Sequence, residues 1–308
     1  MKRPWQWHVI GLLWLICLVP FPCLADDIHV LLVLSGGAAP YQAFVQTFRQ
    51  NTPGNVEASV LQQPEAFSGG EKADLIVAVG LKASEWVISR TNLPVLAAML
   101  PSYKYAELHS KHPGFRELSG IFVDQPWARQ VSLLRAALPD RKNVGVLFSS
   151  GMNLDLGHLG MLLKANGGNL FAQTAGAPGS LFDALENVLS HSEVLLAVPD
   201  SAVYNSNNIR NIMLSSYRHR VPMVGFSEAY VNAGALYALF STPQQLAAQA
   251  SAMVASFMRA GRLPEAQFPR LFKIAVNQEV AKMLGITIES AELLTLQVER
   301  EGRGIDTQ

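Results

Sequence analysis

The feature that most constrains this chain is a regular alternation of short apolar runs with amphipathic stretches. Val194 to Val198 is an uninterrupted apolar run that Pro199 ends, and VPMVGF at 221–226 is a second run of the same kind. Such runs are typical of strands buried on both faces of a parallel sheet. Between them, apolar residues of 205–218 recur at helical spacing. This segment therefore predicts a β-α-β unit with a right-handed crossover.

The same alternation fills the chain in two series. Strands are predicted at 28–34, 56–61, 73–80, 93–100 and 119–124, and then at 143–149, 169–175, 194–198, 221–226, 234–240 and 271–277. Helices are predicted at 41–50, 82–89, 125–138, 153–165, 181–189, 205–218, 244–259 and 278–284, and a surface loop at 103–117. We expect an α/β fold of two Rossmann-like lobes, each a parallel sheet flanked by helices.

The restart of the pattern after the fifth strand, and the late helix at 244–259, predict lobes that are discontinuous in sequence. Residues 26–120 plus 240–268 are expected to form lobe 1, and residues 121–239 plus 269–308 to form lobe 2. The late helix has sound start signals, because Thr242 can cap it and Pro243 suits its first position. Gly261 ends this helix.

The first 25 residues have the pattern of a signal peptide. Lys2 and Arg3 precede an apolar core at 9–19, which is too short to span a bilayer, and Cys23-Leu24-Ala25 resembles a cleavage site. We therefore expect a mature chain that begins at Asp26 and is exported to the periplasm. The alternative is a leader that is retained as an N-terminal anchor.

Composition excludes several kinds of chemistry. Cys17 and Cys23 both lie in the leader, so the mature chain has no disulfide, thiolate metal site or cysteine nucleophile. The formal net charge of zero leaves no basic excess for nucleic acid. No Gly-x-Ser-x-Gly or His-Glu-x-x-His motif occurs. His109 and His112 have helix-like spacing but precede Pro113, which favours a solvated loop over a metal site. No enzyme activity, cofactor or metal is expected.

Polar and aromatic residues follow the strands of the first series, where open α/β sheets bind ligands. Ser35-Gly36 could offer backbone N–H groups to an anion or could form a tight turn. Lys82 could bind a carboxylate, although a solvated lysine is the stronger alternative. The ligand-binding residues predicted in this series are Ser35, Gly36, Tyr41, Gly80, Lys82, Ser102 and Tyr103.

The second series has an equivalent set. Asp200 and Glu228 end neighbouring strands, and either could pair with a ligand ammonium or merely cap the following helix. Tyrosines in both series could stack on a planar ligand or pack between the lobes. The ligand-binding residues predicted here are Ser149, Ser150, Asn153, Asp200, Tyr204, Ser227, Glu228 and Tyr230.

Blocks spread over nearly all the mature chain carry a resemblance to a known family. They are ADLIVAVGLKAS, LSGIFVD, LLRAALPDRKNVGVLFS, LLAVPDSAV, RVPMVGFSEAYVNAGALYAL and VNQEVAKMLGITI. In their order and spacing the chain resembles the substrate-binding proteins of the tryptophan/tyrosine-type ABC transporter family. The resemblance implies a type I periplasmic binding fold, a monomer whose lobes close over a small organic molecule such as an amino acid, and an ABC permease as partner.

Three departures from the family pattern leave the ligand open. Leu100-Pro101-Ser102 stands where the family usually has an Asp-Pro pair, and Phe240 begins a segment that lacks the usual tyrosine and Leu-Gly pair. The loop at 35–41 also lacks the family's acidic residues. Two other functions therefore stay open, a sensory module for a receptor or histidine kinase and, less favoured, a periplasmic hydrolase.

Overall fold

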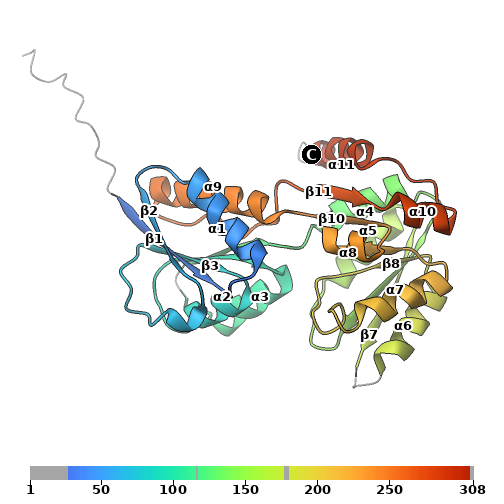
Figure 1. The fold of residues 1–308 in the computed structure, drawn as a ribbon, viewed down its shortest axis with the longest axis horizontal. Coiled ribbons are helices and arrows are strands. Elements are labelled where there is room, and N and C mark those ends of the chain that lie inside the picture. Colours follow the sequence, from blue (N-terminus) through green and yellow to red (C-terminus); the bar gives the residue numbers. More distant parts are fainter. Residues whose placement is uncertain (1–26, 116, 177–179, 306–308) are drawn as a thin grey trace, which may run out of the picture.

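The computed structural model describes residues 27–115, 117–176 and 180–305. The predicted leader and its cleavage after Ala25 lie outside the described residues. Within these three ranges, no helix is both long and apolar enough to cross a lipid bilayer. Two α/β lobes lie side by side and are joined by connecting segments, here called crossovers (Figure 1).

Lobe 1 is built on a five-stranded sheet in which every pairing is parallel. Its strands, in the order β2-β1-β3-β4-β5, are β2 (Val56–Leu61), β1 (Ile28–Leu34), β3 (Leu75–Val79), β4 (Val95–Leu100) and β5 (Leu118–Phe122). Helices α1 (Ala39–Asn51) and α9 (Pro243–Ala260) share one hydrophobic cluster with the sheet, while α2 (Leu81–Ile88) and α3 (Ser102–Lys111) share the other. The helices therefore cover both faces. The 3-10 helix η1 (Pro64–Ala66) lies beside α2.

Lobe 2 has a six-stranded sheet in the order β11-β10-β9-β8-β6-β7. The strands are β6 (Asn143–Ser149), β7 (Asn169–Ala175), β8 (Val194–Leu196), β9 (Met223–Gly225), β10 (Tyr237–Phe240) and β11 (Lys273–Val276). Only β11 pairs antiparallel in the described part of this sheet, and it is the strand that the chain reaches from the other lobe, after α9. The helices are α4 (Trp127–Ala137), α5 (Leu156–Ala165), α6 (Ser180–Ser190), α7 (Ile209–Arg218), α8 (Glu228–Ala233), α10 (Gln278–Leu284) and α11 (Ala291–Ile305).

The chain passes between the lobes three times. It leaves lobe 1 after β5, returns to it between β10 and α9, and leaves again between α9 and β11. The sheet of lobe 1 extends to Phe122, two residues beyond the predicted limit at 120, and β10 retains Phe240 in lobe 2. The assignment of the crossover residues to one lobe or the other stays a prediction.

The structure corrects two expectations about local structure and adds one helix. Residues 102–111 form α3 rather than a loop, because Asp124, distant in sequence, caps the helix start. Helix α7 begins at Ile209 rather than at 205, because the Asn205 side chain accepts from the backbone N–H of Asn207 and folds a turn there. Helix α11 was not predicted, and it buries Leu294 against lobe 2.

Candidate functional site

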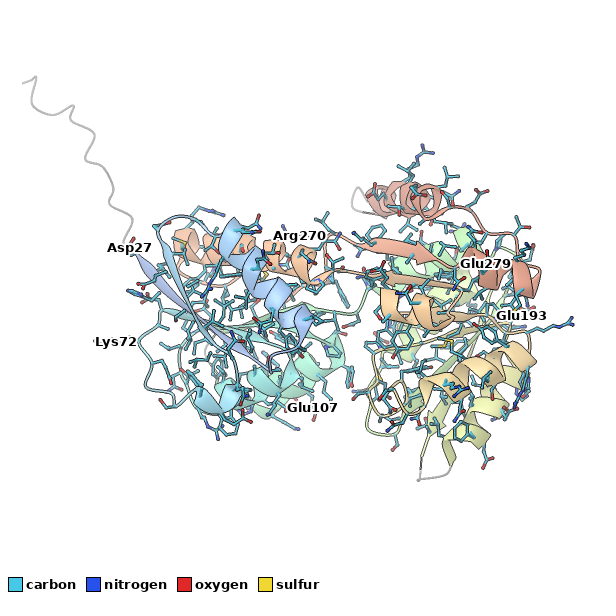
Figure 2. The ribbon with its side chains drawn as sticks, viewed as in Figure 1. Asp27, Lys72, Glu107, Glu193, Arg270 and Glu279 are labelled. Atoms are coloured by element: carbon cyan, nitrogen blue, oxygen red, sulfur yellow. The ribbon has the colours of Figure 1, made fainter. Side chains whose placement is uncertain are left out.

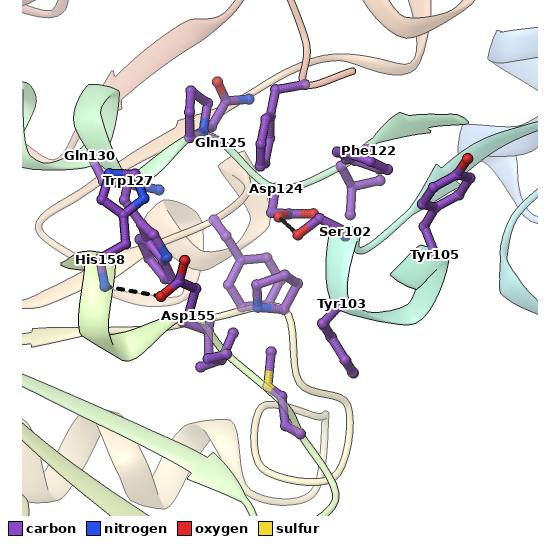
Figure 3. A pocket seen from close by; sticks show the side chains of 18 of the residues that line it. Ser102, Tyr103, Tyr105, Phe122, Asp124, Gln125, Trp127, Gln130, Asp155 and His158 are labelled. Atoms are coloured by element: carbon purple, nitrogen blue, oxygen red, sulfur yellow. Dashed lines mark hydrogen bonds between the residues drawn. The ribbon is translucent and has the colours of Figure 1, made fainter. Parts of the chain in front are cut away.

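A cavity of about 450 Å³ lies between the lobes, at the carboxyl ends of strands from both sheets (Figure 3). Lobe 1 contributes the first turn of α3 and the end of β5. Lobe 2 contributes the start of α4, the loop at 152–155, the segment after β8 at 197–199, and Phe226 after β9. Every one of these segments follows a strand or opens a helix, which is where the strand-end rule places ligands.

Aromatic rings from both lobes form much of the cavity wall. They are Tyr103, Tyr105, Phe122, Trp127, Phe226 and Phe268. The Phe122 ring lies 5.3 Å from that of Tyr105 and meets that of Phe268 edge-on at 5.1 Å, measured between centroids. Rings in these arrangements bury large apolar area and present negative faces to whatever lies against them. The wall suits a ligand with a planar or apolar body.

Asp124 places a carboxylate among these aromatic rings. It follows β5, is partly buried, and accepts hydrogen bonds from the backbone N–H of Ser102 at 2.7 Å and from the Ser102 hydroxyl (Figure 3). Burial raises the pKa of Asp124, against the two bonds from Ser102, which lower it. Burial dominates because removing an ionised carboxylate from water costs more than two hydrogen bonds return here.

Tyr103 connects the two lobes, since it belongs to α3 but packs against the hydrophobic core of lobe 2. Burial raises the pKa of Tyr103 to about 12, and the nearby charges of Asp200, Glu107 and Asp124 add to the shift. The phenol therefore stays protonated at neutral pH. The three carboxylates thus act in the same direction as burial, which is the larger cause.

The wall on lobe 2 adds further acceptors. Asp155 caps α5 by accepting from the backbone N–H of His158 at 2.9 Å. Gln130 is buried, and its Oε1 has no hydrogen-bond partner within the described ranges. An unpaired buried carbonyl oxygen is costly, so this atom favours a donor from a ligand or a water.

A hydrogen-bond network ties the three crossovers together beside the cavity. The buried Gln125 donates to Ser241 Oγ at 2.9 Å, and Ser241 donates to the carbonyl of Leu271 at 2.6 Å. Arg129 donates to Gln125 Oε1 at 2.6 Å and to the carbonyl of Pro269 at 2.9 Å. Arg270, labelled near these crossovers in Figure 2, donates its backbone N–H to the α9 side chain Gln249. The network lies where a hinge between the lobes must bend.

The structure brings three of the sequence-predicted residues into the cavity wall, and these are Ser102, Tyr103 and Asn153. Asp124, Trp127, Phe226 and Phe268 also line it, and sequence reasoning did not select them. Asp124 ends a predicted strand and so had the same signal as Asp200. The sequence does not single out the three aromatic residues, because an aromatic residue in a cavity wall cannot be told from one in the hydrophobic core by sequence alone.

The remaining predicted residues of lobe 1 lie outside the cavity lining. Ser35 Oγ accepts from the backbone N–H of Ala83 at 3.0 Å and so caps the start of α2. Gly80 adopts a φ of +91° beneath Ser35 and Tyr41, and Gly36 adjoins this turn. Lys82 is exposed and pairs with Glu65 at 2.6 Å.

In lobe 2, Asp200 is buried and its carboxylate is used within the lobe. It accepts from the backbone N–H groups of Ser149 at 2.6 Å and Ala202 at 3.0 Å, which joins two strand ends. Tyr204 is buried in the core, and Tyr230 donates to its backbone carbonyl at 3.0 Å. The other predicted residues, Ser150, Ser227 and Glu228, are half-buried or exposed and do not line the cavity. That these residues contact a ligand remains a prediction.

Several solved structures share this fold. A conserved domain protein from Vibrio cholerae matches with a TM-score of 0.63 and 20% identity, over 87% of this chain and 98% of that one. An ABC domain in complex with L-Trp from Streptococcus pneumonia matches with a TM-score of 0.63 and 16% identity, with the same coverage. An open, ligand-free substrate binding protein from Clostridium difficile matches with a TM-score of 0.64 and 16% identity, over 86% and 97%. Among curated proteins, none matches the sequence.

Two parallel α/β lobes joined by three crossovers, with a cavity between them, define the type I periplasmic binding fold, as the resemblance implied. The family model for ABC transporter substrate binding proteins matches residues 45–299. The chain therefore belongs to the ABC transporter substrate-binding family.

Proposed function

We propose that this protein captures a small organic molecule in the cavity between its lobes and delivers it to the permease of an ABC importer. The observation that carries the proposal is the composition of the cavity wall, to which both lobes contribute strand-end residues beside a hydrogen-bonded crossover network. A ligand that touches both lobes favours the closed arrangement over the open one, because only closure completes its contacts. The S. pneumonia relative, whose structure contains L-Trp, supports a ligand of this size.

We further propose that the protein acts in the periplasm as a monomer without catalytic activity. The family is defined by substrate binding for transport, which supports this role and gives no support to the sensory or hydrolytic alternatives. Intact mass of protein recovered from the periplasm should match a chain that begins at Asp26. A mass that retains Met1 would instead indicate a retained leader.

The test of binding combines native mass spectrometry with small-angle X-ray scattering. Protein purified from its own cells should carry a small-molecule adduct that unfolding releases, and adding that compound back should reduce the radius of gyration. A deletion strain should lose uptake of the same compound. If the compound binds but the lobes do not approach one another, or if uptake is unchanged in the deletion strain, the proposed function is wrong.

A further inference from the structure

The charge of the cavity wall narrows the class of ligand. Within the described residues, no lysine or arginine lines the cavity, and His158 is the one histidine in its wall. Two carboxylates, Asp124 and Asp155, line it, and a third, Asp200, contributes to the potential at Tyr103. A negatively charged ligand group would lack a permanent cationic partner here and would face like charges.

Two helix starts that could otherwise hold a ligand anion are already occupied by the chain's own carboxylates. Asp124 accepts from the first residue of α3, and Asp155 caps α5. Helix α4, which begins at Trp127, is the third helix that opens onto the cavity, and it has no acidic side chain in its first turn. An amino acid whose carboxylate lies at the start of α4 is therefore the competing arrangement that an experiment must separate.

The Asp124 carboxylate has capacity for a ligand donor. A carboxylate offers about four lone-pair sites, and among the described residues Asp124 accepts hydrogen bonds from Ser102, through its backbone N–H and its hydroxyl. Figure 3 shows this pair among the rings of the cavity wall, with Phe122 and Tyr103 nearby. The negative faces of aromatic rings beside a carboxylate stabilise an organic cation and disfavour an anion.

We propose that the ligand is an organic amine, bound as its ammonium ion to Asp124 with an aromatic or apolar body against the rings, and that it needs no carboxylate. The proposal rests on the proposed function, since it names the class of molecule that the cavity between the lobes would take. Gln130 Oε1, buried and without a partner in the described part of the chain, is a second acceptor that a donor-rich ligand or its bound water can satisfy.

The test uses a matched set of probes that differ at one group. Phenethylamine, 2-phenylethanol, 3-phenylpropionate and L-phenylalanine share a phenyl ring and an ethyl linker, and tryptamine extends the ring. Each is titrated calorimetrically into the mature protein at neutral pH. We expect both amines to bind. Phenethylamine should bind about tenfold or more tighter than the alcohol, because a hydrogen bond to a charged group is stronger than a neutral one. It should also bind about tenfold or more tighter than the acid and the amino acid, because their carboxylate would face Asp124 and Asp155 without a lysine or arginine partner in the described lining.

Asp124→Asn is the decisive variant, because asparagine can still accept from the Ser102 backbone and serves equally well as a helix cap. We expect it to reduce amine affinity about tenfold or more and to abolish the preference over the alcohol. Asp74→Asn is the matched control, since Asp74 also accepts from a backbone N–H, that of His29 at 2.9 Å, but lies next to the start of β3. Its amine affinity should equal that of the parent.

Each other outcome overturns the proposal. Binding of 3-phenylpropionate or L-phenylalanine as tight as that of phenethylamine would place a carboxylate in the cavity. If the Asp124→Asn variant binds phenethylamine as tightly as the parent does, the ammonium does not bind at Asp124. If neither amine binds while a co-purified compound of another class closes the lobes, the amine proposal is wrong and the proposed function stands. If neither amine binds and no compound closes the lobes, both are wrong.

Discussion

Gly80 shows how a residue that looks like a ligand contact can be required by the backbone. Its φ is +91°, and a Cβ built on it would lie 2.5 Å from Ser35 Oγ and 2.8 Å from the Tyr41 hydroxyl. Glycine is needed here because side chains rarely adopt this backbone conformation and because two polar groups pack directly against it.

Gly80→Ala should therefore lower the free energy of unfolding by about 1–3 kcal/mol, from backbone strain and displacement of the Ser35 cap. Urea denaturation of the purified variant measures this loss. Gly37→Ala in the same region is the control, since a Cβ there meets no atom within 4 Å. Gly37→Ala should show no loss, and an equal loss in both variants would contradict the explanation.

Asp124 makes stability depend on pH in a direction that can be derived from its raised pKa. Below its ordinary pKa, the carboxyl is protonated in the folded and unfolded states and has no effect. As pH rises toward the raised pKa, the unfolded state loses the proton first, so the folded state binds more protons and stability falls. Above the raised pKa the loss is complete and constant.

The free energy of unfolding of Asp124→Asn should thus rise relative to that of the parent as pH rises from acid to neutral. The advantage of the variant should be smallest at acid pH. Chemical denaturation of the ligand-free proteins across a pH series measures that difference. A difference that is independent of pH, or that favours the parent increasingly at neutral pH, would show that burial does not dominate at this carboxyl.

At the scale of elements, helices α9 and α3 illustrate opposite cases. Helix α9 has its start signal in the local sequence, because Thr242 accepts from the backbone N–H of Gln245 and the Gln245 side chain accepts from that of Thr242. The cap is where the chain enters lobe 1, and Leu246 and Ala250 then pack with α1. Helix α3 has its cap 22 residues away at Asp124, so local signals predicted a loop.

Thr242→Ala removes one half of the α9 capping box and should cost about 1 kcal/mol of unfolding free energy. Thermal and urea unfolding followed by circular dichroism measure the loss. Gln244→Ala changes an exposed residue in the same turn and should alter stability by less than about 0.5 kcal/mol. If the two variants lose equal stability, the cap does not stabilise α9.

At the scale of the whole molecule, the crossovers must hold two lobes in register while allowing them to move. Gln125 is the centre of the network, because it is buried and bonds both to Ser241 on the second crossover and to Arg129 at the start of α4. Through Ser241, the network reaches Leu271 on the third crossover. A single side chain therefore couples all three passages of the chain.

Gln125→Ala should broaden the distribution of distances between the lobes in the ligand-free protein and lower the unfolding free energy by about 1–3 kcal/mol. The chain from Asp26 onward lacks cysteine, so fluorophores on Ser110→Cys in α3 and Met161→Cys in α5 label one site in each lobe. Single-molecule energy transfer measures the distribution. Gln173→Ala, which removes a side-chain bond to Asn187 in lobe 2, should leave it unchanged. A distribution that Gln125→Ala leaves equally narrow would show that the network does not restrain the hinge.

The sequence by itself determined most of the strands and helices, though not α3 or α11, and the fold of two α/β lobes built on largely parallel sheets. It could do so because burial periodicity, cap residues such as Thr242 and stops such as Gly261 act within one or two turns of chain. It also placed Ser102, Tyr103 and Asn153 at strand ends that do meet in the cavity.

Only the tertiary structure decided which strand ends face one another. Asp124 and Asp200 both follow a predicted strand. Asp124 lines the cavity, whereas the Asp200 carboxylate accepts a hydrogen bond from the backbone N–H of Ser149. Trp127 and Phe268 share a cavity wall although 141 positions separate them in number. These juxtapositions depend on sheet order and on three crossovers, and contacts between distant segments leave no mark in local periodicity.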